Sequence, residues 1–103
     1  MPTIPPLPQA LQEILEPLCR QRGWRVYIFG SWARGEMHPR DIDIAIQADP
    51  PPSEAEMAEL RWQLEEAPIP YRIDLVRYDL ADPGLRAEID AHGILWTPEN
   101  GLK

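Results

Sequence analysis

The chain reads Asp41-Ile42-Asp43-Ile44-Ala45-Ile46 near its middle. Isoleucine alternates there with aspartate and alanine, and this period of two predicts a β-strand with the isoleucines on one face and both aspartates on the other. Side chains two residues apart on one face of a strand are separated by about 6–7 Å, so the two carboxylates can reach a shared pair of metal ions. Because two like charges on such a strand repel each other, we expect a cation to offset them.

A second informative segment, Gly30-Ser31-Trp32-Ala33-Arg34-Gly35, precedes this strand. It follows the apolar run Trp24–Phe29, which predicts a central strand buried on both faces. A glycine lets the backbone approach a ligand closely, and successive N–H groups with a serine hydroxyl form an anion-binding nest. Gly30 and Ser31 are therefore candidate ligands of a triphosphate. Residues 30–40 are expected to form a loop, and a short helix starting near Ser31 would add a favourable dipole.

A third carboxylate is expected from a strand at Tyr71–Arg77, where Asp74 stands inside an otherwise apolar stretch. Transfer of a nucleotidyl group uses two Mg²⁺ ions about 3.5–4 Å apart. Mg²⁺ takes a few carboxylate oxygens and completes its shell with water and phosphate. Asp41, Asp43 and Asp74 are the candidate metal ligands. The alternative for Asp74 is an ordinary ion pair with an arginine of its own strand.

Four other residues near this site have two possible interpretations each. Arg34 and Arg40 either contact phosphate oxygens or are surface residues and partners of Glu36. His38 either contacts the substrate or is solvated. Trp32 either stacks on a base or fills an interface with a partner protein.

Length and charge limit the classes of function. A chain of 103 residues forms one small domain. The net charge is −7 and no basic stripe is visible, so direct nucleic-acid binding is not expected. The single cysteine excludes an internal disulfide, which fits a cytoplasmic location. No apolar run approaches the ~18 residues of a membrane span, so no membrane contact is expected.

The order of patterns predicts an α+β fold, with a small mixed sheet of about four strands and helices packed on it, in one domain over residues 1–103. Residues 1–8 are expected to be irregular and residues 97–103 to form a tail. Helix signals such as the capping box that starts at Ser53 and the Asp82-Pro83 pair mark the later helices. The expected elements are helices over 9–22 (with a kink at Pro17), 53–67 and 82–93, and strands over 24–29, 41–47, 71–77 and 94–96.

These residues resemble the polymerase β-like nucleotidyltransferase superfamily, and most of all its minimal nucleotidyltransferases. The resemblance covers residues 24–77 and rests on a Gly-Ser turn, a spacer, Asp-x-Asp in a strand and a later strand aspartate. This sequence has Arg40 where the family usually has a serine, and its spacer is one residue shorter than the commonest form. The roles that the resemblance implies are triphosphate binding by Gly30 and Ser31, binding of both metals by Asp41 and Asp43, and completion of the catalytic metal site by Asp74, which also helps to deprotonate the incoming hydroxyl.

The resemblance further implies a Mg²⁺-dependent enzyme that transfers AMP from ATP to a hydroxyl of a partner protein. The partner expected for such a chain is a HEPN toxin, the role is that of its antitoxin, and the expected assembly is a hetero-oligomer. Two alternatives stay open. One is a non-catalytic antitoxin that acts by occlusion of its partner, and the other is a nucleotidyltransferase for small molecules such as antibiotics.

Overall fold

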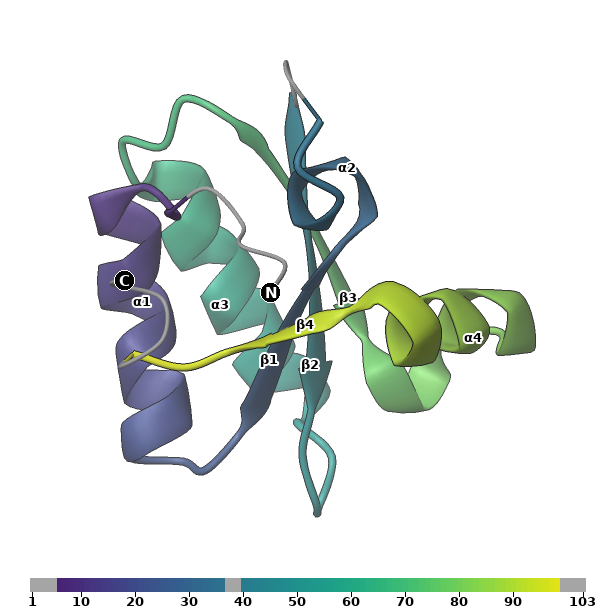
Figure 1. Cartoon of the computed structure of the whole chain (residues 1–103). Helices are drawn as coiled ribbons and strands as arrows, with labels where there is room; N and C mark the ends of the chain where they lie inside the picture. The colour runs from purple at the N-terminus through teal and green to yellow at the C-terminus, as the bar shows by residue number, and fades with distance from the viewer. Residues whose placement is uncertain (1–5, 37–39, 99–103) are drawn as a thin grey trace.

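The structure, a computed structural model, describes residues 6–36 and 40–98. The α+β class expected from the sequence is confirmed, because helices pack on one four-stranded mixed sheet (Figure 1). The elements in chain order are α1 (Gln9–Arg20), β1 (Arg25–Phe29), α2 (Gly30–Ala33), β2 (Asp41–Gln47), α3 (Glu54–Glu66), β3 (Arg72–Arg77), the 3₁₀ turn η1 (Tyr78–Leu80), α4 (Pro83–His92) and β4 (Ile94–Trp96).

The strands lie in the order β3-β2-β1-β4. β1 runs antiparallel to both of its neighbours, β2 and β4, whereas β2 and β3 are parallel. The register places Asp43 opposite Phe29 of β1 on one side and opposite Asp74 of β3 on the other. The end of β1, the Asp-x-Asp strand and the third acid therefore meet in one part of the sheet.

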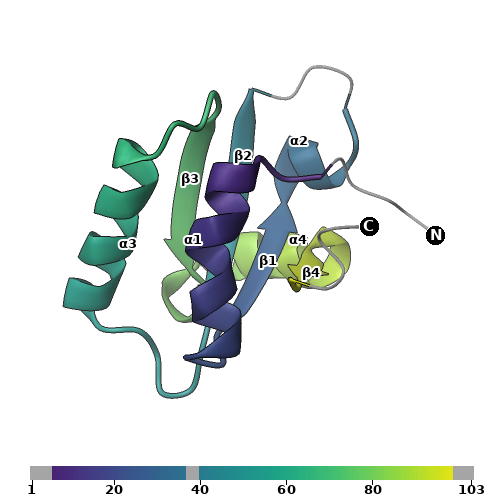
Figure 2. The same ribbon diagram turned by 90° about the vertical axis from the view of Figure 1, so that its left-hand side faces the viewer.

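Helices cover both faces of the sheet, with α1 and α3 on one face and α4 on the other (Figures 1 and 2). The main core lies under α1 and α3 and contains Ile42, Ile44 and Ile46, all fully buried. A smaller cluster on the α4 side contains Phe29, Ala45 and Ile89. Because side chains alternate along β2, the aspartates share the face of Ala45, as the sequence pattern predicts.

Local signals begin and end the helices as expected. At α3 the Ser53 hydroxyl accepts the N–H of Glu56, and the Glu56 carboxylate accepts the N–H of Ser53, which completes the predicted capping box. At α4 the Asp82 carboxylate accepts the N–H of Leu85. Gly23, with φ +69°, follows the end of α1, where a left-handed residue commonly stops a helix.

Some boundaries differ from the sequence expectations. α1 contains Pro17 and ends at Arg20, two residues before the predicted end. The short helix expected near Ser31 is present as the single-turn helix α2, whereas η1 was not predicted. His38 lies outside the described residues, so the choice between its two interpretations stays open. No helix in the described ranges is both long and apolar enough to cross a membrane.

Candidate functional site

The centre of the site is the pair Asp43 and Asp74, which occupy matching positions of the parallel strands β2 and β3. Their carboxyl groups are close enough for Asp74 to raise the pKa of Asp43. Asp41 lies two residues before Asp43, on the same face of β2. All three acids are half-buried, so the structure brings the predicted carboxylates to one region on the side of the sheet where α4 packs.

This crowding changes the proton affinity of the central acid. The pKa of Asp43 is raised from 3.8 to about 6, first by burial and then by the charge of Asp74, a hydrogen bond with Asp74 and the charge of Asp41. The positive charge of Arg34 opposes the rise. Negative charge at Asp43 is therefore costly in the protein alone, and a bound cation would relieve that cost.

Gly30 lies directly against this carboxyl group. Its φ is +73°, a left-handed conformation that favours glycine. A Cβ atom built on Gly30 would overlap the Oδ2 oxygen of Asp43. The backbone of the turn and the central carboxylate are thus in contact only because residue 30 has no side chain, and a ligand held by this turn lies next to the acids.

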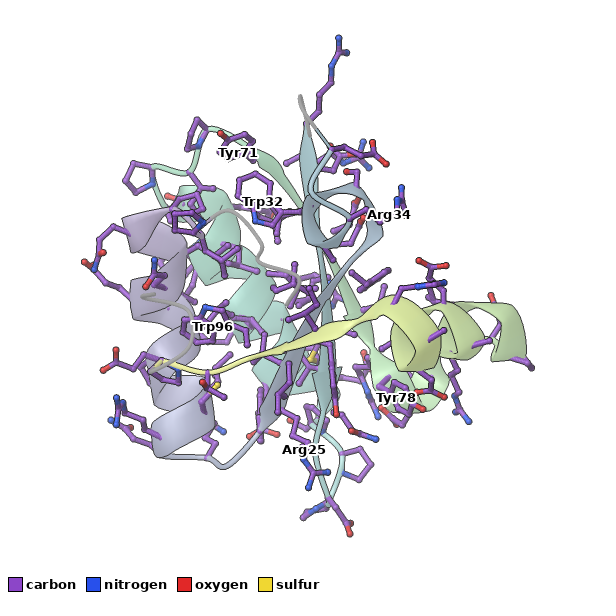
Figure 3. The ribbon with its side chains drawn as sticks, in the orientation of Figure 1. Arg25, Trp32, Arg34, Tyr71, Tyr78 and Trp96 are labelled. Carbon is purple, nitrogen blue, oxygen red and sulfur yellow. The ribbon has the colours of Figure 1, made fainter. Side chains whose placement is uncertain are left out.

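The side chains of Trp32, in α2, and of Arg34, directly after it, point in opposite directions (Figure 3). Trp32 points to the layer of α1 and α3, where its ring meets Tyr71 in an edge-to-face contact with 4.9 Å between the ring centroids. Only 4% of the Trp32 surface is exposed. The expectation that Trp32 stacks on a base or fills a partner interface is therefore wrong, because this side chain belongs to the core of its own domain. Ser31 is half-buried in the same turn.

Arg34 follows α2 and extends to the side of the sheet that carries the acids (Figure 3). Its guanidinium contacts the Glu36 carboxylate, with 2.8 Å between Nη2 and Oε2 and 2.9 Å between Nε and the same oxygen. Glu88 of α4 lies 3.7 Å away from Nη1. The predicted partner Glu36 is thus present, and the charge of Arg34 also reaches Asp43. The sequence did not predict Glu88 as a neighbour of Arg34, because only the packing of α4 brings the two side chains together.

Asp74 also has the ion pair that the sequence offered as the alternative. Its Oδ1 oxygen lies 3.4 Å from Nε of Arg72, while Arg77 bonds to Asp79 and Glu54 instead. The Arg40 side chain is exposed, and its backbone carbonyl accepts the N–H of Arg72. Within the described ranges, no set of three or more acidic, histidine or cysteine side chains is close enough to hold a metal by itself.

Comparison with known proteins places this geometry in a family. The family model described as "Polymerase beta, Nucleotidyltransferase" matches residues 13–100. No curated protein matches the chain.

Several solved structures are similar. A crystal structure described as a toxin-antitoxin with AMP-PNP is 26% identical, with a TM-score of 0.65, 87% of this chain and 74% of that chain covered. A mutant of the toxin-antitoxin MntA-HpeT is 26% identical, with a TM-score of 0.64, 84% of this chain and 69% of that chain covered. A second MntA-HpeT mutant is 25% identical, with a TM-score of 0.57, 71% of this chain and 59% of that chain covered.

The family match spans most of the sequence and includes the turn, the Asp-x-Asp strand and the third acid. These are the segments that the structure brings together at Asp43. The chain belongs to the polymerase β nucleotidyltransferase family and is a nucleotidyltransferase domain.

Proposed function

We propose that this chain transfers AMP from ATP, with Mg²⁺, to a hydroxyl of a partner protein, and that the two proteins form a toxin–antitoxin pair with a HEPN toxin as the partner. The observation that carries the proposal is the packing of Asp43 against Asp74 and against the backbone of Gly30. Family membership supports nucleotidyl transfer, and the similar structure with AMP-PNP supports ATP as the donor.

The chemistry of the three acids suits Mg²⁺, with substrate and water oxygens needed to complete the binding, because in the described part of the chain the acids are not close enough to hold a metal by themselves. Oxygen ligands from a few carboxylates are what Mg²⁺ requires, with water and substrate phosphate completing the shell. Asp41, Asp43 and Asp74 would hold the ions, and the raised pKa of Asp43 fits a carboxylate cluster whose negative charge a bound cation would offset. Bound there, Mg²⁺ supplies the positive charge that stabilises the attacking and the leaving oxygens.

The protein's own groups position the reactants. The backbone at Gly30 and the hydroxyl of Ser31 face the triphosphate, and Arg34 adds positive charge to phosphate oxygens. The acceptor oxygen bonds to the α-phosphorus while the bond from that phosphorus to pyrophosphate breaks. The family resemblance implies that Asp74 helps to take the proton that the acceptor hydroxyl loses.

A partner protein would supply the acceptor hydroxyl. The three acids are half-buried, so they stay partly open to a group that a partner presents. The similar structures are toxin-antitoxin pairs, which supports a toxin as the partner. The net charge of −7 suits a basic partner.

The test is transfer of label from α-³²P-ATP, in the presence of Mg²⁺, to the purified product of the neighbouring gene. We expect label on that protein with the wild-type chain, and a loss of at least 100-fold with Asp43→Ala. Asp49→Ala is the matched control, because Asp49 is an exposed acid in the loop after β2. Label that is absent, or equal with Asp43→Ala, would sink the proposal of catalysis.

The two alternative functions, a non-catalytic antitoxin and an enzyme for small molecules, predict different results for the same wild-type and variant proteins. An antitoxin that acts by occlusion still suppresses its toxin when both Asp41→Asn and Asp43→Asn are present, and it binds Mg²⁺–ATP weakly in calorimetry. An enzyme for small molecules labels an aminoglycoside and leaves the neighbouring gene's product unlabelled.

A further inference from the structure

The strand β3 forms one edge of the sheet. The N–H of Arg72 donates to the carbonyl of Arg40, on the side of β2, over 3.3 Å. Because backbone groups alternate in direction along a strand, those of Ile73 and Leu75 point away from β2. In the described part of the chain no strand pairs with that side. A free edge of this kind is a template for one more strand.

Two hollows follow the free edge. One of about 560 Å³ lies between β3 and the second half of α3, and one of about 340 Å³ lies further along, beside η1 and the start of α4. Both are lined by Arg61 and Leu75, so they form one groove, which we call the β3 groove. Figure 2 shows β3 and α3 side by side at this edge. Leu80, which is 66% exposed, lines its far end.

The first hollow is apolar at its base and positive at its rim. Ile73 and Leu75 pack against the core but stay partly exposed. The exposed side chains of Arg61 and Arg72 line the hollow, and Glu65 is the single acid among its lining residues. Two arginines against one glutamate leave a small excess of positive charge among the lining residues, and Asp74 offsets part of it through its ion pair with Arg72. The ligand that it fits is a segment with apolar side chains and a carboxylate.

We propose that the β3 groove is the docking site of the acceptor protein, which adds an extended segment to the edge of β3 and places an acidic side chain between Arg61 and Arg72. The proposal takes the existence of an acceptor protein from the proposed function. An added strand lies about 4.8 Å from β3, and β3 itself carries Asp74. The docked segment therefore brings its neighbouring residues to the acid that takes the hydroxyl proton.

A second copy of this chain is the competing occupant of the same edge. Opposite residues of an antiparallel pair turn their backbone groups either both toward the partner strand or both away from it, so a two-fold axis must pass through a residue of β3. An axis on Asp74 places that acid opposite itself, which destabilises the pair. An axis on Leu75 brings no like charges together, so a dimer is one of the outcomes that the test has to distinguish.

The direct test is amide hydrogen exchange, measured residue by residue by NMR, on the full chain with and without the purified product of the neighbouring gene. In the free chain we expect fast exchange at Ile73 and Leu75, and slow exchange at Asp74 and Val76, whose N–H groups face β2. In the complex, exchange at Ile73 and Leu75 slows about tenfold or more.

A charge variant gives a second measurement. Arg61→Glu is expected to weaken binding of the same protein about tenfold, whereas Arg25→Glu, an exposed arginine at the start of β1, leaves it unchanged. Circular dichroism checks that both variants are folded.

The outcomes separate this proposal from the proposed function. A complex that forms without slower exchange at Ile73 and Leu75 overturns the docking site and leaves the transfer reaction standing. A protected edge with no transfer of label supports the docking site and overturns the reaction. Slow exchange at the edge of the isolated chain, with a dimer mass in light scattering, assigns the groove to a second copy and overturns the proposal. Absence of any complex overturns both.

Discussion

Replacement of Asp43 by asparagine is expected to make the metal-free protein more stable at neutral pH. Asparagine has nearly the same shape and its amide can donate a hydrogen bond to Asp74, but it carries no charge. The wild-type acid has a pKa raised to about 6 by burial, by the charge of Asp74, by their hydrogen bond and by the charge of Asp41. The substitution therefore removes a group whose charged form the folded protein disfavours.

The sign and the size of this change in stability follow from the difference in the proton affinity of Asp43 between the folded and the unfolded chain. The folded state holds the proton of Asp43 up to about pH 6, whereas an unfolded aspartate loses it near pH 3.8. The folded state therefore binds more protons in this window, and stability falls as pH rises through it. The full difference is about 3 kcal/mol at about 1.4 kcal/mol per tenfold change. The carboxyl stays partly open to solvent, so we expect about 1–2 kcal/mol after screening.

The assay is thermal unfolding with a chelator present, at several pH values between 4 and 7. At pH 7 the Asp43→Asn variant should unfold about 5–10 °C above the wild type, and the gap should close as pH falls to about 4. Glu59→Gln, an exposed site in the middle of α3, is the control and should show no such gap. In a separate scan without chelator, added Mg²⁺–ATP should raise the unfolding temperature of the wild type only. A variant that is less stable than the wild type at pH 7, or a gap that does not depend on pH, would refute the reasoning.

Three further predictions concern the turn, the core and the edge of the site. Gly30→Ala should abolish Mg²⁺–ATP binding in calorimetry and should cost more stability than Gly23→Ala. Both glycines have a positive φ, but only at residue 30 would the added Cβ overlap a carboxylate. Equal losses of stability for the two variants would contradict this. Trp32→Ala should cost about 3–5 kcal/mol in urea unfolding, against less than about 0.5 kcal/mol for the exposed Trp62→Ala; a small loss at residue 32 would mean that its ring is not in the core. Asp79→Asn should lower stability at pH 7, because the hydrogen bond from Arg77 holds the pKa of Asp79 below its usual range in the folded state. The loss of stability should shrink as pH falls through that lowered pKa. A loss that persists in acid would exclude this cause.

Much of the fold could be predicted because its signals are local. The alternation of apolar and polar residues marks β2 at both of its observed ends, and side-chain caps mark the starts of α3 and α4. The strand over Tyr71–Arg77 was predicted to within one residue. Each of these features depends on neighbours in sequence, so one chain without relatives is enough to find them.

The remaining features depend on contacts between distant segments. Trp32 stands in a short turn with no apolar periodicity around it, and only the packing of its ring against Tyr71 shows that it is buried. Glu88 reaches Arg34 because α4 folds back over the sheet. The groove beside β3 arises from the spacing between α3 and an edge strand, which no local pattern records. The roles of Gly30, Ser31, Arg34 and the three acids stay predictions that the proposed experiments test.

The burial of Trp32 has a consequence for how substrate binds. This ring is fixed in the core within the same helical turn that contains Gly30 and Ser31. The turn is thus ordered before any ligand arrives, and binding does not have to freeze a mobile loop, a cost of about 1–2 kcal/mol of backbone entropy for each residue fixed. We expect the triphosphate to meet a preorganised turn, so that a small domain with few contacts to offer can still hold its substrate.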